Sequence, residues 1–288
     1  MAAYDIAVIG GGPAGLSAAV QARQRGKTVV IIAGDDRDGP LQKTQLVENY
    51  LGMPHESGPE LLAAFRRHAA DMGAERLMGR ALNIMAMPGT FYLSVGSDMV
   101  EAGAIVLAPG VARGAKYPGE AEHLGLGLSY CATCDGMLYR KRPVVVVGKS
   151  AEAPEEAAFL QGIGCLVTYV AARQPEDLPA EIPFVKGSKI EILGQTAVSG
   201  VRVDGQELPC DGVFILRAAI APTDLLPGLA LRDGYIAVDR EMQTSVPGVF
   251  AAGDCTGQPL QVSKAVGEGQ LAGHHAAEYV DKQKKTVQ

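Results

Sequence analysis

The sequence predicts an α/β protein built from two Rossmann-like nucleotide-binding folds, the second inserted into the first and reduced in size. A glycine-rich turn and a second, altered turn support this prediction, because each follows a short hydrophobic strand and precedes a helical segment. A third observation, a strand ending in Gly253-Asp254, indicates that the first fold resumes near the C-terminus. We therefore expect the first fold to comprise residues 1–113 and 239–288, with the insert at 114–238.

The first fold opens with a βαβ unit. A hydrophobic strand at residues 4–9 leads into a GxGxxG turn, an alanine-rich helix follows over 16–25, and a second strand is expected at 28–32. In such a turn the first glycine permits the tight bend, the second lets the backbone approach a pyrophosphate, and the third lets helix and strand pack closely. The helix N-terminus then offers free N–H groups to the phosphates. The candidate cofactor-binding residues of this turn are Gly10, Gly12, Pro13, Ala14 and Gly15.

In this kind of unit an acidic residue that closes the second strand binds the adenine ribose. Asp35 stands just beyond the strand and is the candidate for that role. The alternative is a solvated aspartate in a loop.

The second fold has a similar design with an altered turn. Val144–Val147 is expected to form its first strand, Ala157–Leu160 to lie in its helix, and Leu166–Val170 to form its next strand. The turn reads Gly148-Lys149-Ser150-Ala151-Glu152-Ala153. After the insert, we expect a strand within 244–254 and a helix over 262–280.

Composition restricts the possible classes of function. The net charge of −6 argues against strong nucleic-acid binding, and no apolar run is long enough to cross a bilayer. The chain starts directly with a strand and has no basic leader, so a cytoplasmic location is expected. Five cysteines with one CxxC pair form neither a secreted disulfide framework nor a tetrahedral zinc site.

Several further residues are expected to have structural roles. Cys165, Cys210 and Cys255 are interpreted as small apolar side chains in the interior. Met85 and Met87 are interpreted as packing residues. We expect no metal site at His274-His275, because no other ligand lies nearby in the sequence.

The segment Cys131-Ala132-Thr133-Cys134-Asp135 predicts a redox-active disulfide. Cysteines three residues apart can share one turn at the start of a helix, where the free N–H groups and the dipole lower a thiol pKa. A lower pKa favours exchange, because the thiolate is the attacking species. The alternative is a pair of buried structural thiols.

These motifs, in this order, resemble the low-molecular-weight thioredoxin reductases over essentially the whole chain. The resemblance implies FAD in the outer fold, with its pyrophosphate at Gly10–Gly15. The matching segments are Gly10–Gly15, Val47-Glu48-Asn49-Tyr50 with Gly52, Leu107-Ala108-Pro109-Gly110, Pro118-Gly119-Glu120, Ser129–Gly136, Val249–Asp254, Gln261 and Gly267-Glu268-Gly269.

The resemblance also implies roles for individual residues. Asp254, after Gly253, would lie near the ribityl–phosphate region of FAD, and Asn49 and Gln261 near its isoalloxazine ring. Cys134 would face the flavin, Cys131 would attack the disulfide of thioredoxin, and Asp135 would be the acid/base that moves the proton. For Asp135, the alternative is an ordinary residue of a first helical turn. Gly110, in the Leu107–Gly110 match, is a further candidate for cofactor binding.

The chain departs from the NADPH-using members of this family within the insert. Lys149 stands where those members have a second glycine, and Glu152 places a carboxylate where phosphate should approach. In the NADPH-using members a cluster of cations binds the 2′-phosphate, and only one of these cations remains here, in Ala171-Ala172-Arg173. A glycine-bearing turn of those members is replaced here by Ile215–Pro222. The insert is also short, with 120 positions between Cys134 and Asp254.

In these losses the chain is similar to the ferredoxin-dependent flavin thioredoxin reductases. We therefore expect a homodimeric enzyme that passes electrons from reduced ferredoxin through FAD to the Cys131–Cys134 disulfide and on to thioredoxin. Arg140-Lys141-Arg142, with Arg113 and Lys116, could attract an acidic ferredoxin, and a solvated turn is the alternative. Three other functions stay open: an NADPH-dependent thioredoxin reductase, an oxygen-linked dithiol oxidase, and a non-catalytic flavin-binding redox sensor.

Overall fold

The chain forms two compact units, one inserted into the other. The computed structural model describes residues 1–34, 39–96, 98–111, 116–217 and 221–286, so Asp35 and Arg113 lie outside the described residues. Unit 1 comprises residues 1–112 and 219–288, and unit 2 comprises residues 113–218. The chain returns to unit 1 some twenty residues before the expected position 239. The reason is that two segments before residue 239 contact unit 1. The short helix α6 (Pro222–Leu225) contacts strand β4 (Ala81–Met87), and strand β16 (Tyr235–Ile236) contacts the turn at Asp254–Thr256.

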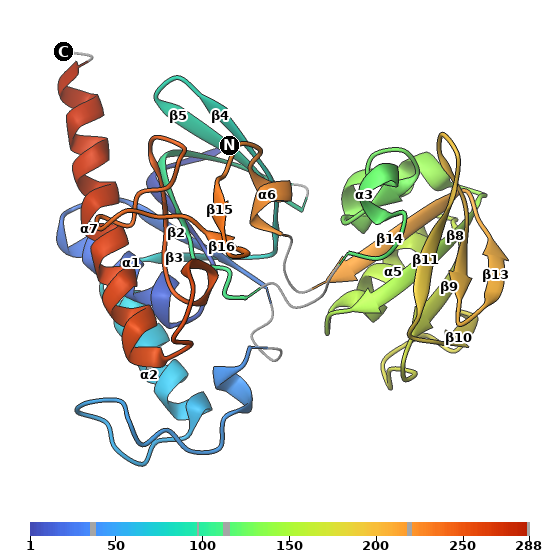
Figure 1. Cartoon of the computed structure of the whole chain (residues 1–288), viewed down its shortest axis with the longest axis horizontal. Helices are drawn as coiled ribbons and strands as arrows, with labels where there is room; N and C mark the ends of the chain where they lie inside the picture. The colour runs from blue at the N-terminus through green and yellow to red at the C-terminus, as the bar shows by residue number, and fades with distance from the viewer. Residues whose placement is uncertain (35–38, 97, 112–115, 218–220, 287–288) are drawn as a thin grey trace. The chain divides into compact units, whose positions relative to one another are not determined.

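Unit 1 is a Rossmann-like sheet extended by an antiparallel edge (Figure 1). The strand order is β3-β2-β1-β6-β5-β4, and β17 pairs with β6. Strands β1, β2, β3, β6 and β17 pair in parallel, whereas β4 and β5 are antiparallel additions. The strands are β1 (Ala2–Ile9), β2 (Val29–Ala33), β3 (Glu75–Met78), β4 (Ala81–Met87), β5 (Thr90–Val95), β6 (Asp98–Leu107) and β17 (Val249–Ala251), and a small hairpin adds β15 (Leu231–Arg232) and β16.

The helices of unit 1 are α1 (Pro13–Gln24), α2 (Gly58–Asp71), α6 and α7 (Val262–Thr286). Helices α1 and α7 lie side by side (Figure 1) with their backbones in close contact. A Cβ atom at Gly269 would lie 2.1 Å from the Ala14 carbonyl oxygen, and one at Gly273 would lie 2.3 Å from that of Ala18. Only glycine permits such an approach. The helix that follows the first glycine turn is therefore fixed against the C-terminal helix.

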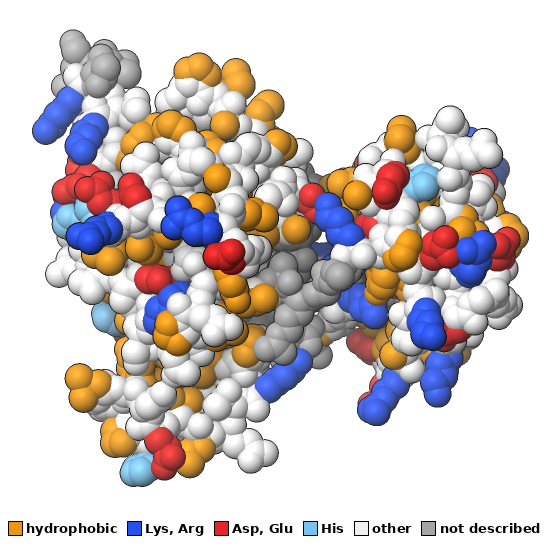
Figure 2. Space-filling model, in the orientation of Figure 1, with side chains coloured by type: hydrophobic (Ala, Val, Ile, Leu, Met, Phe, Trp, Pro, Cys, Tyr) orange, Lys and Arg blue, Asp and Glu red, His pale blue; other side chains and the backbone are white. Residues whose placement is uncertain are grey.

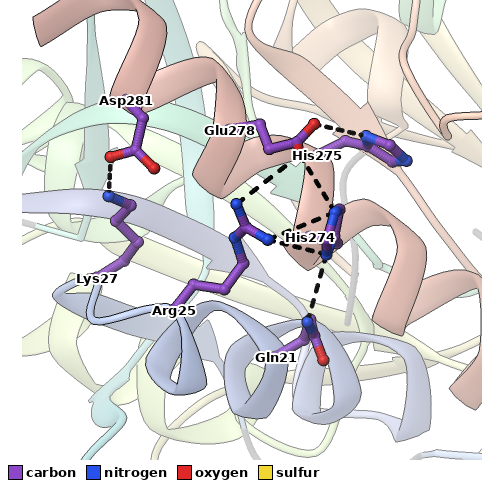
Figure 3. Close-up of polar contacts among 7 residues, drawn as sticks. All are labelled: Gln21, Arg25, Lys27, His274, His275, Glu278 and Asp281. Atoms are coloured by element: carbon purple, nitrogen blue, oxygen red, sulfur yellow. Dashed lines mark hydrogen bonds and ion pairs between the residues drawn. The ribbon is translucent and has the colours of Figure 1, made fainter.

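Polar contacts continue this helix pair beyond its glycines (Figure 3). Lys27, which is 7% exposed, forms an ion pair with Asp281 of α7. The Arg25 guanidinium lies 3.3 Å from His274 and 3.8 Å from Glu278. Figure 2 shows acidic, basic and histidine side chains close together on this edge of unit 1. Because burying an unpaired charge costs free energy, the Lys27–Asp281 pair stabilises the contact between the end of α1 and α7.

Unit 2 has a parallel sheet with the order β10-β9-β8-β14-β7 and an antiparallel sheet β11-β12-β13. One helix of regular length, α5 (Ala153–Gly162), follows β8. The strands are β7 (Leu128–Ser129), β8 (Pro143–Lys149), β9 (Leu166–Ala171), β10 (Phe184–Lys186), β11 (Ile190–Gly194), β12 (Val198–Val203), β13 (Gln206–Pro209) and β14 (Gly212–Arg217), and two single-turn helices are α3 (Glu120–His123) and α4 (Ala132–Asp135).

Most of the expected elements form, with three differences. The strand expected within 244–254 is limited to Val249–Ala251, because the N–H group of Val249 closes a turn onto the Val246 carbonyl. The final helix continues past residue 280 to Thr286. The expectation for two methionines was wrong: Met85 is 52% and Met87 is 49% exposed on the edge strand β4. Among the described residues, no helix is long and apolar enough to cross a membrane.

The Lys27–Asp281 pair gives a prediction about stability. The hydrogen bond from Lys27 lowers the pKa of Asp281, so its contribution is present above the unfolded-state pKa and is lost as pH falls through the folded-state pKa. Replacing Asp281 with Asn should lower the free energy of unfolding of unit 1 by about 1 kcal/mol at neutral pH, a small value because Asp281 is partly exposed. Urea unfolding at several pH values should show this difference shrinking below about pH 4.

The control is Asp71→Asn at the exposed end of α2, which should leave unfolding nearly unchanged. An equal loss in both variants, or a loss that persists in acid, would contradict the assignment.

Candidate active site

The two cysteines of the CxxC segment are joined by a disulfide at the start of α4. Cys131 is the N-cap residue of this helix, and its sulfur accepts the N–H group of Cys134 at 3.0 Å. The Thr133 hydroxyl lies 3.4 Å from the same sulfur. Donors directed at a sulfur favour its thiolate form. Cys131 is 7% exposed, whereas Cys134 is exposed, so Cys134 is the more accessible residue of the pair.

Asp135 is held by a residue that the sequence interpretation did not single out. The Ser129 hydroxyl lies 2.6 Å from Oδ2 of Asp135 and accepts the N–H group of Cys131 at 3.0 Å. Ser129 ends β7 and is buried. The signal in the sequence that could have identified Ser129 is its position, two residues before the CxxC segment and at the end of a buried strand.

The other three cysteines are interior residues, as expected. Cys165, Cys210 and Cys255 are at most 5% exposed and carry free thiols. Burial raises the pKa of each thiol, to about 12 for Cys210 and Cys255. At neutral pH these thiols are therefore protonated and unreactive.

The GxGxxG turn of unit 1 has the shape that a pyrophosphate requires. Gly10 has φ +118°, and a Cβ atom there would lie 2.1 Å from the Ala108 carbonyl oxygen. A Cβ atom at Gly15 would lie 2.0 Å from the Gly10 carbonyl oxygen, whereas the space beside Gly12 is open. No side chain caps the N-terminus of α1, and its first turn has no acidic residue. Its N–H groups are thus available to an anion.

Candidate cofactor residues from distant parts of the chain come together within unit 1. The side-chain amide of Asn49 donates to Oε1 of Gln261 at 2.8 Å, although the two residues are 212 positions apart. A Cβ atom at Gly253 would lie 2.8 Å from that of Ala14. Gly110, with φ +72°, also borders open space. All of these residues belong to unit 1, whereas Cys131, Cys134 and Asp135 belong to unit 2.

An ion pair that the sequence analysis did not anticipate holds the loop that carries Asp254. Lys264 Nζ donates to the carbonyl oxygens of Gly253 and Gly257, each at 2.8 Å, and lies 3.0 Å from Glu268. Glu268 in turn accepts the N–H group of Gly253 at 2.9 Å and the Thr256 hydroxyl at 2.7 Å. Three features of unit 1 fit a dinucleotide such as FAD. They are the open glycine turn, the uncapped N-terminus of α1, and the Gly253–Gly257 loop that the ion pair holds.

His274, His275 and Glu278 come within 4.8 Å of one another on α7. The sequence analysis overlooked Glu278, which lies one helical turn after His274. A cation already occupies this position, because Arg25 contacts His274 (Figure 3). We assign the group to the contact between α1 and α7 and not to a metal.

A nucleotide-binding fold combined with an exposed CxxC disulfide defines a flavin-type disulfide oxidoreductase, and comparisons with known proteins agree. The family model for pyridine nucleotide-disulphide oxidoreductases matches residues 4–269. The thioredoxin reductase of Listeria monocytogenes is 34% identical over 309 aligned positions, which cover 99% of this chain and 96% of that protein.

Two solved structures are similar over nearly the whole chain. A ferredoxin-flavin thioredoxin reductase from Clostridium acetobutylicum has a TM-score of 0.93 and 40% identity, covering 99% of this chain and all of that one. A thioredoxin reductase from Gloeobacter violaceus has a TM-score of 0.85 and 34% identity, covering 98% and 95%. The chain belongs to the thioredoxin reductase family, and the Cys131–Cys134 pair is its redox-active disulfide.

The Lys264–Glu268 pair leads to a prediction about cofactor affinity. Lys264→Met removes the cation that holds two loop carbonyls, so the Gly253–Gly257 loop loses its fixed conformation. We expect the Kd for FAD to rise about tenfold, the effect of losing one or two charge-assisted hydrogen bonds. Titration of apoprotein with FAD, followed by quenching of flavin fluorescence, measures the change.

Lys285→Met is the control, because Lys285 is exposed in the last turn of the same helix. It should bind FAD like the unchanged protein. Equal affinity in both variants would show that the pair does not support the cofactor.

Proposed function

We propose that this protein is a cytoplasmic, homodimeric FAD enzyme that reduces thioredoxin through the Cys131–Cys134 disulfide, with reduced ferredoxin as the electron donor. Its similarity to a protein described as a ferredoxin-flavin thioredoxin reductase supports this donor. The observation that carries the proposal is the state of the crevice in unit 2 where a nicotinamide nucleotide would bind.

The position of that crevice follows from the strand order of unit 2. In the order β10-β9-β8-β14-β7, the chain runs from β8 outward to β9 and β10 and later returns to β14 on the other side of β8, so the topological switch point lies between β8 and β14. Nucleotides bind outside the carboxyl ends of the strands at such a point. The last residues of β8 and β14, Lys149 and Arg217, are register partners there. Both belong to segments that depart from the NADPH-using pattern.

One aromatic ring lies close to both of these cations. The Tyr117 ring centroid is 5.1 Å from the Arg217 guanidinium and 5.8 Å from Lys149 Nζ, within the range of cation–π attraction. Glu120 is fully buried and pairs with Arg217, accepting Nη2 at 2.8 Å. It also accepts the backbone N–H group of Tyr117 and the hydroxyl of Tyr130, each at 2.8 Å. We infer that this cluster fills the space that a nicotinamide nucleotide needs.

Electrostatics support the same conclusion. Burial alone would raise the pKa of Glu120, but hydrogen bonds from Arg217, Tyr117 and Tyr130 bring that pKa below its usual value, so Glu120 stays ionised and keeps Arg217 engaged.

The first turn of α5 adds to this effect, because it carries Glu155 and Glu156 after the N-cap residue Glu152. A helix N-terminus with carboxylates repels a pyrophosphate instead of binding it.

The turn below α5 is closed from its other side. A Cβ atom at Gly148 would lie 1.8 Å from the Tyr169 hydroxyl, so that phenol packs directly against the turn. Tyr169 is 1% exposed, and burial raises its pKa to about 12. This glycine accommodates a tyrosine, whereas Gly12 in unit 1 borders open space.

The proposed reaction balances over two electrons. Two molecules of reduced ferredoxin supply one electron each, and the Cys131–Cys134 disulfide takes up both with two protons to become a dithiol. The dithiol then reduces the disulfide of thioredoxin by exchange and is itself reoxidised. FAD, when bound, converts single electrons into a pair. The N-cap position of Cys131 favours the thiolate that exchange requires.

Apolar side chains beside the disulfide suit a protein substrate. Met137 and Leu138 follow Asp135 almost directly and are 57% and 70% exposed. Exposed apolar residues next to a reactive group are typical of protein–protein contacts. We propose that thioredoxin docks on them.

An anaerobic titration tests the donor. NADPH added to the yellow protein should leave the flavin absorbance unchanged, because the crevice of unit 2 is filled. Reduced ferredoxin, added with thioredoxin, should yield thioredoxin thiols in stoichiometric amount. Complete and rapid bleaching by NADPH would replace the proposal with the NADPH-dependent alternative. Oxygen consumption with small dithiols would favour the oxidase, and an absence of thiol exchange would favour the redox sensor.

The basic turn after the disulfide tests the docking of ferredoxin. Arg140, Lys141 and Arg142 are all exposed, and the Nε atom of Arg140 donates to the Ile163 carbonyl at 3.0 Å. Reversing the other two charges, Lys141→Glu with Arg142→Glu, should raise the apparent KM for ferredoxin about fivefold at low salt, and added salt should diminish the effect. Thioredoxin turnover with an artificial donor should not change.

Lys186→Glu, an exposed charge reversal on β10, is the matched control. A similar increase in KM for both variants would assign the effect to net charge. An unchanged KM in the double variant would mean that this turn is only a solvated loop.

A further inference from the structure

We propose that Ser129 is a positioning residue for thiol–disulfide exchange, fixing the Asp135 carboxylate and the Cys131 backbone in one arrangement. The inference deepens the proposed function, because it rests on Asp135 acting as the acid/base of the exchange. Ser129 touches neither sulfur and acts through its two neighbours.

The direction of the hydrogen bonds follows from the distances. Ser129 Oγ lies 2.6 Å from Oδ2 of Asp135 and 3.2 Å from the Cys131 carbonyl oxygen. A hydroxyl group has one proton, and the shorter contact to a charged acceptor takes it. The lone pairs of Oγ accept the N–H group of Cys131 at 3.0 Å. Ser129 thus holds both ends of the five-residue active segment.

The serine can do this because the sheet of unit 2 holds it. Ser129 pairs with Phe214 of β14, and Phe214 is fully buried. Ser129 itself is 5% exposed, so little water competes for its hydroxyl. By contrast, α4 is a single turn, which cannot fix its own side chains by helix formation alone. The sheet therefore sets the position of Asp135 through this one hydroxyl.

The arrangement assigns different tasks to the two carboxylate oxygens. Oδ2 receives the Ser129 proton donor, which leaves Oδ1 for the proton that moves during exchange. When the Cys131 thiolate attacks thioredoxin, a mixed disulfide forms and one thioredoxin sulfur leaves as a thiolate. Cys134 then gives up its proton and attacks Cys131, which releases the second thioredoxin sulfur. Asp135 takes the proton from Cys134 and passes it to a released sulfur, so protons and electrons balance.

The test uses enzyme reduced chemically beforehand, so the outcome does not depend on the electron donor. Stopped-flow reduction of excess thioredoxin is measured for Ser129→Ala, Ser129→Thr and Asp135→Asn, and for Ser129→Ala combined with Asp135→Asn. We expect Ser129→Ala to slow the exchange about tenfold at neutral pH, and Ser129→Thr to restore it to within about threefold. The recovery with Ser129→Thr, which keeps the hydroxyl, is the readout that a merely structural role for Ser129 would not give.

The double variant separates positioning from mere structure. In the Asp135→Asn background, Ser129→Ala should change the rate less than about twofold, because its effect passes through that carboxylate. An equal slowing in both backgrounds, or no recovery with Ser129→Thr, would overturn the inference. If Asp135→Asn alone leaves the rate unchanged, Asp135 is not the acid/base of the exchange and the inference fails, whereas the proposed reduction of thioredoxin stands. Thiol titration of each variant confirms that both cysteines are available.

Discussion

A carboxylate that is completely shielded from solvent has to be paired, and in unit 2 this constraint falls on Glu120. Its partners come from three segments: the backbone of Tyr117 near the entry of the chain into the unit, Arg217 near the exit, and Tyr130 directly before the disulfide. One charge therefore links both connections of the unit to its reactive segment. The contact between Arg217 and the Tyr117 ring depends on the same pairing, because Arg217 is fixed by Glu120.

The two units share a fold but differ in the surroundings of the turn after the first strand. In each, a parallel sheet delivers a turn and a helix N-terminus to the carboxyl edge of its strands. In unit 1 that turn borders open space and the helix has no acidic first turn. In unit 2 a phenol packs under the turn and carboxylates occupy the helix start. The difference lies in a few side chains, while the backbone architecture is retained.

The sequence predicted what depends on local pattern. The βαβ unit, the glycine turn and the CxxC pair at a helix start are specified by residues close together in the chain, and all of them form. The hydrogen bond between Asn49 and Gln261 was not predicted, since no local signal connects residues 212 positions apart; the family resemblance implied only that both lie near the isoalloxazine ring.

The features that the sequence did not predict depend mainly on side-chain contacts between residues far apart in the chain. The cluster of Tyr117, Glu120 and Arg217 could not be inferred, although Lys149 and Arg217 had been recognised as departures from the family pattern. The exposure of Met85 and Met87 was missed because an apolar side chain on an edge strand has the same local sequence as one in a core. The early return to unit 1 was missed because short loops carry no periodicity.

The burial of three thiols has a consequence for the fidelity of repeated turnover. An enzyme that opens and closes a disulfide in every cycle exposes its remaining cysteines to wrong pairing and to oxidation. Here those thiols lie in the interior and are held protonated, so they are slow both as nucleophiles and as targets. Each reoxidation therefore favours the Cys131–Cys134 pair over pairing with these three thiols.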